Sequence, residues 1–225
     1  MTVKRQDLID DLVNDLHPIR RPGKVGRGAL LCLLAATLWS IVIVLVTGPL
    51  RPGALRDLAT QPWFVAETLL AALAIVALGV AALRSAIPGE PRTTLRLLWL
   101  LPVVAWVAVY VAELVYPPAW ASSLGGRYEC HGQVVLFSLP AFALFLWSAR
   151  RLFPLRPRST GFLAGAAAAA IPGALMQFGC MYVPEHILIH HIAPVAVVAV
   201  LGALVGPYLL RQREQSRRPR GAAIH

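Results

Sequence analysis

The sequence predicts an all-α polytopic membrane protein with six transmembrane helices, and three observations support this prediction. Of the 225 residues, 57% are hydrophobic and only 14% are charged, which is too apolar for a water-soluble domain. Six apolar stretches approach the roughly 20 residues that a helix needs to cross a bilayer. They cover residues 29–47, 62–83, 95–116, 132–152, 161–178 and 187–210. The basic residues alternate in abundance between successive connections, as expected for membrane-spanning segments.

This alternation of charge predicts the orientation. Eighteen of the 21 Lys and Arg residues precede the first stretch, follow the last, or lie in the second and fourth connections or at the ends of the stretches that border them. The other connections hold only Arg51, Arg56 and Arg127. Because basic connections stay in the cytoplasm, both termini are predicted to be cytoplasmic. The net charge of +10 then reflects topology and contact with anionic membrane lipid, and no direct binding to nucleic acid is expected.

Three parts follow from this pattern: a cytoplasmic segment 1–28, a transmembrane domain 29–210 and a basic cytoplasmic tail 211–225. The first part contains QDLIDDLVNDL at residues 6–16, which has the spacing of an amphipathic helix. One face carries Leu8, Ile9, Leu12, Val13 and Leu16, and the other carries Asp7, Asp10, Asp11 and Asp15. A helix on an anionic membrane would carry Lys and Arg on its polar face. The acidic face therefore favours binding in the groove of a partner protein, although packing on the protein's own cytoplasmic loops is an equally open alternative.

Within the membrane domain, two carboxylates and one stretch of small residues are informative. Glu67 and Glu113 lie near the outer ends of the second and third stretches, where we expect them to reach interfacial water. The fifth stretch is rich in Gly and Ala, with Gly161 and Gly165 ahead of an alanine run. This composition predicts close packing against another helix.

A group of cysteines and histidines is predicted on the outer surface. Cys130 and Cys180 lie at the same depth in two outer connections, where an oxidising compartment would allow a disulfide. His186 and His190 are four residues apart and share a helical face, whereas His191 is expected to point elsewhere. Thiolates and imidazoles are suitable ligands for zinc, cadmium or another thiophilic ion. The candidate ligands are Cys130, His131, Cys180, His186 and His190.

Several functions remain open for this group. It could be a structural disulfide with interfacial histidines, a redox or metal sensor, or a catalytic or haem site. A membrane thiol–disulfide redox protein and a small metal-binding or transport protein are the alternatives from other classes. The first lacks a CxxC motif, and the second lacks ionisable residues in the inner half of the bundle. The chain also has no P-loop, GxGxxG or HExxH motif, so no enzymatic activity and no certain cofactor are expected.

The chain resembles a known family in three features. These are the N-terminal segment LIDDLVNDLHPIR, the six apolar stretches, and two cysteines, one before the fourth stretch and one before the histidine-bearing sixth stretch. They are similar to the NrsF-type (negative regulator of sigma F) membrane anti-sigma factors. The resemblance implies a bacterial inner-membrane protein whose cytoplasmic N-terminus holds an extracytoplasmic-function (ECF) sigma factor inactive. It implies that Cys130 and Cys180 are the family's periplasmic pair, implicated in responses to heavy metals such as chromate and cadmium.

The same resemblance places the acidic motif of the family on Asp10, Asp11, Asp15 and Leu16. With the neighbouring helix positions, the expected sigma-binding residues are Asp7, Leu8, Asp10, Asp11, Leu12, Asp15 and Leu16. The expected function is sequestration of the sigma factor and its release on a periplasmic redox or heavy-metal signal. Metal ligation by the histidines is not implied by the resemblance and depends on the residue chemistry alone.

Overall fold

The computed structural model describes residues 5–14, 25–48, 50–88, 93–118, 129–180 and 182–211. Within these ranges every regular element is a helix. In chain order the elements are α1 (Arg5–Asn14), α2 (Val25–Thr47), α3 (Ala54–Thr60), α4 (Pro62–Arg84), α5 (Thr93–Glu113), α6 (Cys130–Arg150), α7 (Pro157–Leu175), the 3₁₀ turn η1 (Met176–Phe178), α8 (Pro184–Ile187), the π-helical turn η2 (Leu188–Ile192) and α9 (Ala193–Leu209). The predicted all-α class is confirmed for the described part of the chain.

Among the described residues, five helices are long and apolar enough to cross a membrane. They are Gly26–Thr47, Pro62–Arg84, Cys130–Arg150, Pro157–Phe178 and Pro184–Leu209. The predicted stretch 95–116 is also largely helical, in α5, but its described apolar part, Trp99–Glu113, is shorter than these five. The prediction of apolar membrane helices is therefore confirmed for five stretches, and the sixth span stays a prediction.

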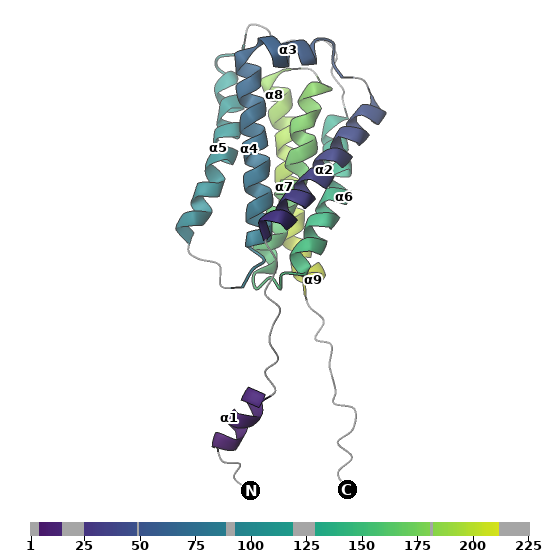
Figure 1. The fold of residues 1–225 in the computed structure, drawn as a ribbon. Helices are drawn as coiled ribbons and strands as arrows, with labels where there is room; N and C mark the ends of the chain where they lie inside the picture. The colour runs from purple at the N-terminus through teal and green to yellow at the C-terminus, as the bar shows by residue number, and fades with distance from the viewer. Residues whose placement is uncertain are drawn as a thin grey trace.

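The long helices form a bundle in which neighbours in sequence run in opposite directions (Figure 1). The start of α2 and the end of α9 lie at the same end of the bundle, whereas α3 and α8 lie at the opposite end. Helix α1 stands apart from the bundle (Figure 1). The two termini of the bundle therefore share one side, and the cysteine-bearing connections share the other.

Helix α7 forms the centre of the bundle. Of its apolar window 78% is buried, compared with 33 to 39% in the other four candidate spans. Its small residues explain this position, because a Cβ atom on Gly161 or Gly165 would collide with the backbone of α9. Close approach of this kind is how helices associate in membranes without large side chains. The close packing predicted for this stretch is confirmed, with α9 as its principal partner.

Arg51 fixes the connection between α2 and α3 onto the end of α7. Its backbone N–H donates to the carbonyl of Phe178 at 2.8 Å, and its Nε donates to the carbonyl of Gln177 at 3.3 Å. Its guanidinium forms an ion pair with Asp57 at 2.7 Å. These contacts provide hydrogen-bond donors for the carbonyls of Gln177 and Phe178, which the turn after α7 would otherwise leave unpaired. They hold in place the backbone immediately before Cys180.

Candidate functional site

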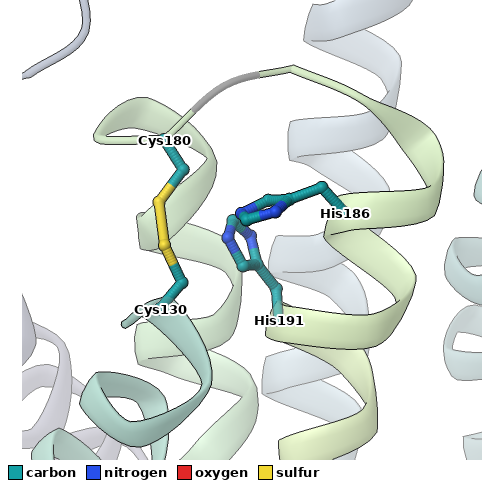
Figure 2. A group of neighbouring side chains, drawn as sticks. All are labelled: Cys130, Cys180, His186 and His191. Carbon is teal, nitrogen blue, oxygen red and sulfur yellow. A yellow bond between two sulfur atoms is a disulfide. The ribbon is translucent and has the colours of Figure 1, made fainter. Parts of the chain in front are cut away.

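Cys130 and Cys180 are joined by a disulfide at the end of the bundle where α8 lies (Figure 2). Cys130 is the first residue of α6, and Cys180 follows η1. Both side chains are fully buried. The bond closes a chain loop with a sequence separation of 50 residues. In the chain-entropy view, closing a loop of this length stabilises the folded state by on the order of 4 kcal/mol.

Two histidine rings face this disulfide from the last membrane helix (Figure 2). The ring centroids of His186 and His191 are 5.3 Å apart. One potential ligand atom from each of Cys130, Cys180, His186 and His191 lies within 4.8 Å of all the others. We refer to these four residues as the disulfide–imidazole group.

Three of the four ring nitrogens of these histidines are buried without a hydrogen-bond partner among the described residues. This holds for both ring nitrogens of His191 and for Nε2 of His186. His191 is completely buried, whereas His186 is half-buried. Burying an imidazole without a partner costs free energy, and a partnerless buried polar group in a native fold requires an explanation.

The expectation that His191 points away from the group is wrong, and the backbone explains why. Residues Leu188–Ile192 form a π-helical turn, in which hydrogen bonds span five residues instead of four. The wider turn brings His191 to the same side as His186, five residues earlier. The ideal α-helical spacing used for the prediction does not apply here.

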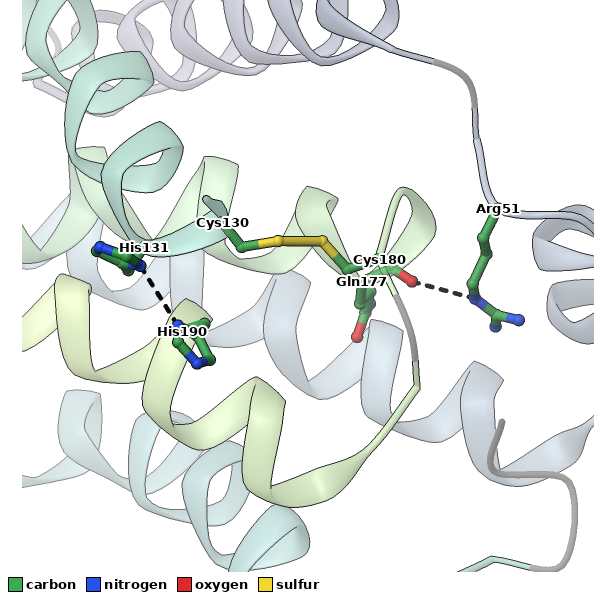
Figure 3. Close-up of a disulfide and its surroundings, with 6 residues drawn as sticks. All are labelled: Arg51, Cys130, His131, Gln177, Cys180 and His190. Carbon is green, nitrogen blue, oxygen red and sulfur yellow. Dashed lines mark hydrogen bonds between the residues drawn. A yellow bond between two sulfur atoms is a disulfide. The ribbon is translucent and has the colours of Figure 1, made fainter. Parts of the chain in front are cut away.

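The predicted ligands His131 and His190 form a separate pair beside the group. Their Nδ1 atoms lie 3.4 Å apart (Figure 3), and His190 also lies next to His186, with ring centroids 4.6 Å apart. His131 is exposed and His190 is partly exposed. Of the five predicted ligands, the structure therefore brings Cys130, Cys180 and His186 into one group, which also contains His191. His131 and His190 lie beside this group and are not part of it.

On the other side of the connection that carries Cys180, Tyr182 enters a second buried polar network. Its hydroxyl donates to Glu67 and lies 3.4 Å from both carboxylate oxygens of Glu113. Glu113 also accepts a hydrogen bond from Trp63 Nε1. Burial, and then the charge of Glu67, raises the pKa of Tyr182 well above its ordinary value, so that the phenol stays protonated and acts as a donor.

The expectation that Glu67 and Glu113 reach interfacial water is wrong. Both carboxylates are buried, because Tyr182 and Trp63 supply the donors that water would otherwise provide. We call Glu67, Glu113, Tyr182 and Trp63 the glutamate–tyrosine network. Tyr182 is not among the predicted site residues. The only feature of the sequence that could have indicated it is its position two residues after Cys180.

Hydrogen bonds through Tyr110, which is itself a hydrogen-bond partner of Glu67, extend from this network to Gln177 in the turn that Arg51 contacts. Tyr110 donates to Oε1 of Gln177 at 2.8 Å, and Nε2 of Gln177 lies 3.4 Å from the hydroxyl of Thr68. Figure 3 shows Gln177 between Arg51 and the disulfide. The residues that precede and follow Cys180 are therefore both held by buried polar contacts.

The predicted partner-binding segment coincides with α1, and part of it lies outside the described residues. The side chains of Ile9, Asp10 and Val13 are exposed. Asp15 and Leu16 lie outside the described residues, and so does the predicted tail after Arg211. Within α1, the side chains of four more predicted residues are also outside the description: Asp7, Leu8, Asp11 and Leu12. The third cysteine, Cys32, is buried in α2, with its sulfur 3.0 Å from Oγ of Ser148, and does not belong to the disulfide–imidazole group.

Comparison of the chain with known proteins identifies its family. Two curated relatives match 93% of this chain and their own full length. One is the anti-sigma-F factor NrsF of Caulobacter vibrioides, 25% identical over 228 residues, and the other is the probable anti-sigma-F factor NrsF of Azospira oryzae, 28% identical over 221 residues. No solved structure matches the chain. The family model described as "Negative regulator of sigma F" matches residues 12–212, and the chain therefore belongs to the NrsF family.

Proposed function

We propose that this protein is a membrane anti-sigma factor without enzymatic activity. It sequesters an ECF sigma factor through its acidic N-terminal helix and releases it when Cys130 and Cys180 sense a periplasmic redox or heavy-metal signal. The observation that carries the proposal is membership of the NrsF family over residues 12–212, with relatives named as anti-sigma-F factors.

The distribution of charge supports an orientation with both termini in the cytoplasm of a bacterium and six spans across its inner membrane, α5 being the sixth. The end of the bundle at which α2 starts and α9 ends carries the described basic residues Arg27, Arg84, Arg150, Arg151, Arg156, Arg158 and Arg211. At the opposite end, Arg51 is paired with Asp57. Such asymmetry matches the positive-inside rule and supports a periplasmic position for the disulfide–imidazole group, in a compartment where disulfides persist.

Helix α1 has the features of a segment that docks on a protein. Its exposed Ile9 and Val13 are four residues apart and therefore lie on one face. Sigma factors approach DNA and RNA polymerase through basic surfaces, so an acidic helix with an apolar stripe would bind one by charge steering and by insertion into a groove.

The cysteine pair is suited to act as the signal input, because it covalently joins two elements that are 50 residues apart in sequence. The disulfide ties the start of α6 to the connection leading into α8. Forming or breaking it changes the constraint on two membrane helices whose other ends face the side of the termini (Figure 1). Allosteric couplings typically change an affinity by about 5- to 150-fold, which is enough to release a bound regulator.

Deletion of residues 1–17 tests the sigma-binding role. In cells that carry a reporter dependent on the sigma factor, the deletion is expected to switch the reporter on without a signal, as is the triple substitution of Asp10, Asp11 and Asp15 by Lys. A control introduces three lysines into the C-terminal tail instead, by substituting Gln212, Glu214 and Gln215 by Lys, and should leave the reporter repressed. Continued repression by the deletion variant, at equal amounts in the membrane, would disprove the sigma-binding role.

A second experiment tests the sensing role separately. Replacing Cys130 and Cys180 by Ser should abolish induction by an oxidant or a heavy metal while the sigma factor still binds. Cys32→Ser is the control and should respond like the unaltered protein. Normal induction in the double variant would remove the pair from the mechanism.

A further inference from the structure

The disulfide–imidazole group contains buried nitrogen atoms that the disulfide itself does not use. Both ring nitrogens of the fully buried His191 and Nε2 of His186 lack a hydrogen-bond partner among the described residues. Figure 2 shows the two rings directed toward the disulfide, and they meet each other in an edge-to-face arrangement with an interplanar angle of 80°. A buried imidazole without a partner is unfavourable, so a second state in which these nitrogens are bound would account for their position.

The group has the donor set of a tetrahedral metal site. Two sulfur and two imidazole nitrogen atoms are available within 4.8 Å of one another. With zinc–sulfur bonds near 2.3 Å and zinc–nitrogen bonds near 2.0 Å, neighbouring donors in a tetrahedral site are about 3.3 to 3.8 Å apart. Small side-chain rotations are enough to reach this geometry, provided that the two sulfur atoms are no longer bonded to each other.

We propose that the reduced protein binds one thiophilic divalent cation of the zinc class through Cys130, Cys180, His186 and His191. A partner dithiol breaks the sulfur–sulfur bond by exchange, donates two electrons and two protons to the cysteines, and is itself converted into a disulfide. The cation then displaces the two thiol protons into solvent and binds the thiolates and the two imidazoles. Reoxidation by a partner disulfide reverses the exchange and expels the ion.

The disulfide and the ion therefore exclude each other. This gives the group two closed states, one cross-linked by a covalent bond and one cross-linked by a metal, which hold α6 and the last membrane helix in different ways. The inference rests on the proposed function only in using the same cysteine pair as its redox centre. Its test measures metal binding alone, so that its failure can be told apart from a failure of sigma-factor release.

The test uses the purified full-length protein in detergent micelles, reduced with a phosphine that does not bind metal through sulfur. Titration with Co²⁺ should produce the visible absorption of tetrahedral cobalt together with thiolate charge-transfer bands, saturate at one ion per chain, and be reversed by Zn²⁺. The oxidised protein should show neither feature. Reduced protein that gives no such bands would overturn the proposal.

Histidine variants identify the ligands. His186→Ala and His191→Ala should each lower the affinity for Co²⁺ by more than the roughly 10- to 100-fold that is typical for loss of an outer-shell partner. The matched controls His131→Ala and His190→Ala should bind Co²⁺ like the unaltered protein. Because His191 is buried, formation of the disulfide in the oxidised His191→Ala variant, detected by resistance of its thiols to alkylation, shows that the variant is folded. Full affinity in both His186→Ala and His191→Ala, or loss of binding in the two control variants instead, would contradict the assignment.

Discussion

Cys180 and Tyr182 are two residues apart, yet they enter buried polar groups of opposite character. On the side of Tyr182, the hydroxyl and indole donors meet the carboxylates of Glu67 and Glu113, and one carboxylate oxygen, Oε1 of Glu67, lacks a described partner. On the side of Cys180, three imidazole nitrogens of two histidines lack one. The glutamate–tyrosine network, with all but one of these polar atoms paired, stabilises one conformation, whereas the disulfide–imidazole group keeps several unused ligand atoms for a second state.

The largest expected difference between the two regions concerns the ring of Tyr182. This side chain is 0% exposed and packs edge-on against Phe64, with ring centroids 5.6 Å apart. Tyr182→Ala should lower the free energy of unfolding by about 3 to 5 kcal/mol, because it creates a cavity and removes the hydrogen bonds. Thermal unfolding in detergent measures this effect. Tyr116→Ala, at a position 81% exposed, is the control and should unfold at nearly the original temperature; equal losses for the two variants would contradict the buried network.

A smaller effect is expected when only the hydroxyl is removed. Tyr182→Phe keeps the ring but leaves the carboxylates of Glu67 and Glu113 without their shared donor, which should cost about 1 to 3 kcal/mol of stability. The same thermal measurement applies, with Tyr116→Phe as the matched control. An unchanged unfolding temperature for Tyr182→Phe would show that the hydroxyl does not stabilise the fold.

The position of His191 depends on a glycine in α7. A Cβ atom on Gly173 would lie 2.9 Å from the carbonyl oxygen of His191, closer than real contacts allow. Gly173→Ala should therefore displace η2 and weaken Co²⁺ binding to the reduced protein about tenfold, as changes beside metal ligands do. Gly132→Ala, where nothing lies within 4 Å of the added atom, is the control. Unaltered binding in Gly173→Ala would mean that this contact does not position the ligand.

The smallest effect on stability, and the sharpest contrast with Tyr182, is expected for His191→Leu. In the oxidised protein this change removes a buried imidazole that has no described partner, so that the unfolding temperature should stay the same or rise. Thermal unfolding of the oxidised variant tests this directly. A loss as large as that of Tyr182→Phe would show that His191 makes a stabilising hydrogen bond in the disulfide state.

Hydropathy and small-residue content predict the main features of the fold, because they report properties of single helices. The apolar stretches and the central position of α7 follow from composition alone. The pairing of Cys130 with Cys180 is also accessible, since the alternation of basic connections puts both at one depth. These inferences need only composition, spacing and the distribution of charge along the chain, and no knowledge of side-chain packing.

Two features of the site could not be predicted for the opposite reason. The hydrogen bonds of Tyr182 to Glu67 and Glu113 cross 115 and 69 residues of sequence, and no local pattern indicates them. The placement of His191 depends on the π-helical turn η2, which the ideal spacing of an α-helix cannot show. In both cases the periodicity of an ideal α-helix, which is all that the local sequence offers, does not contain the information that places the side chain.

The proposed mechanism requires that the redox state of Cys130 and Cys180 sets the affinity for the sigma factor. The most direct measurement uses the full-length protein in detergent micelles or lipid nanodiscs, with the fraction of bound sigma factor determined before and after reduction of the disulfide. The affinity for the sigma factor is expected to differ by about 5- to 150-fold between the oxidised and reduced states. This difference should persist in Cys32→Ser and disappear when Cys130 and Cys180 are both replaced by Ser. Equal affinity in the oxidised and reduced states would contradict this mechanism.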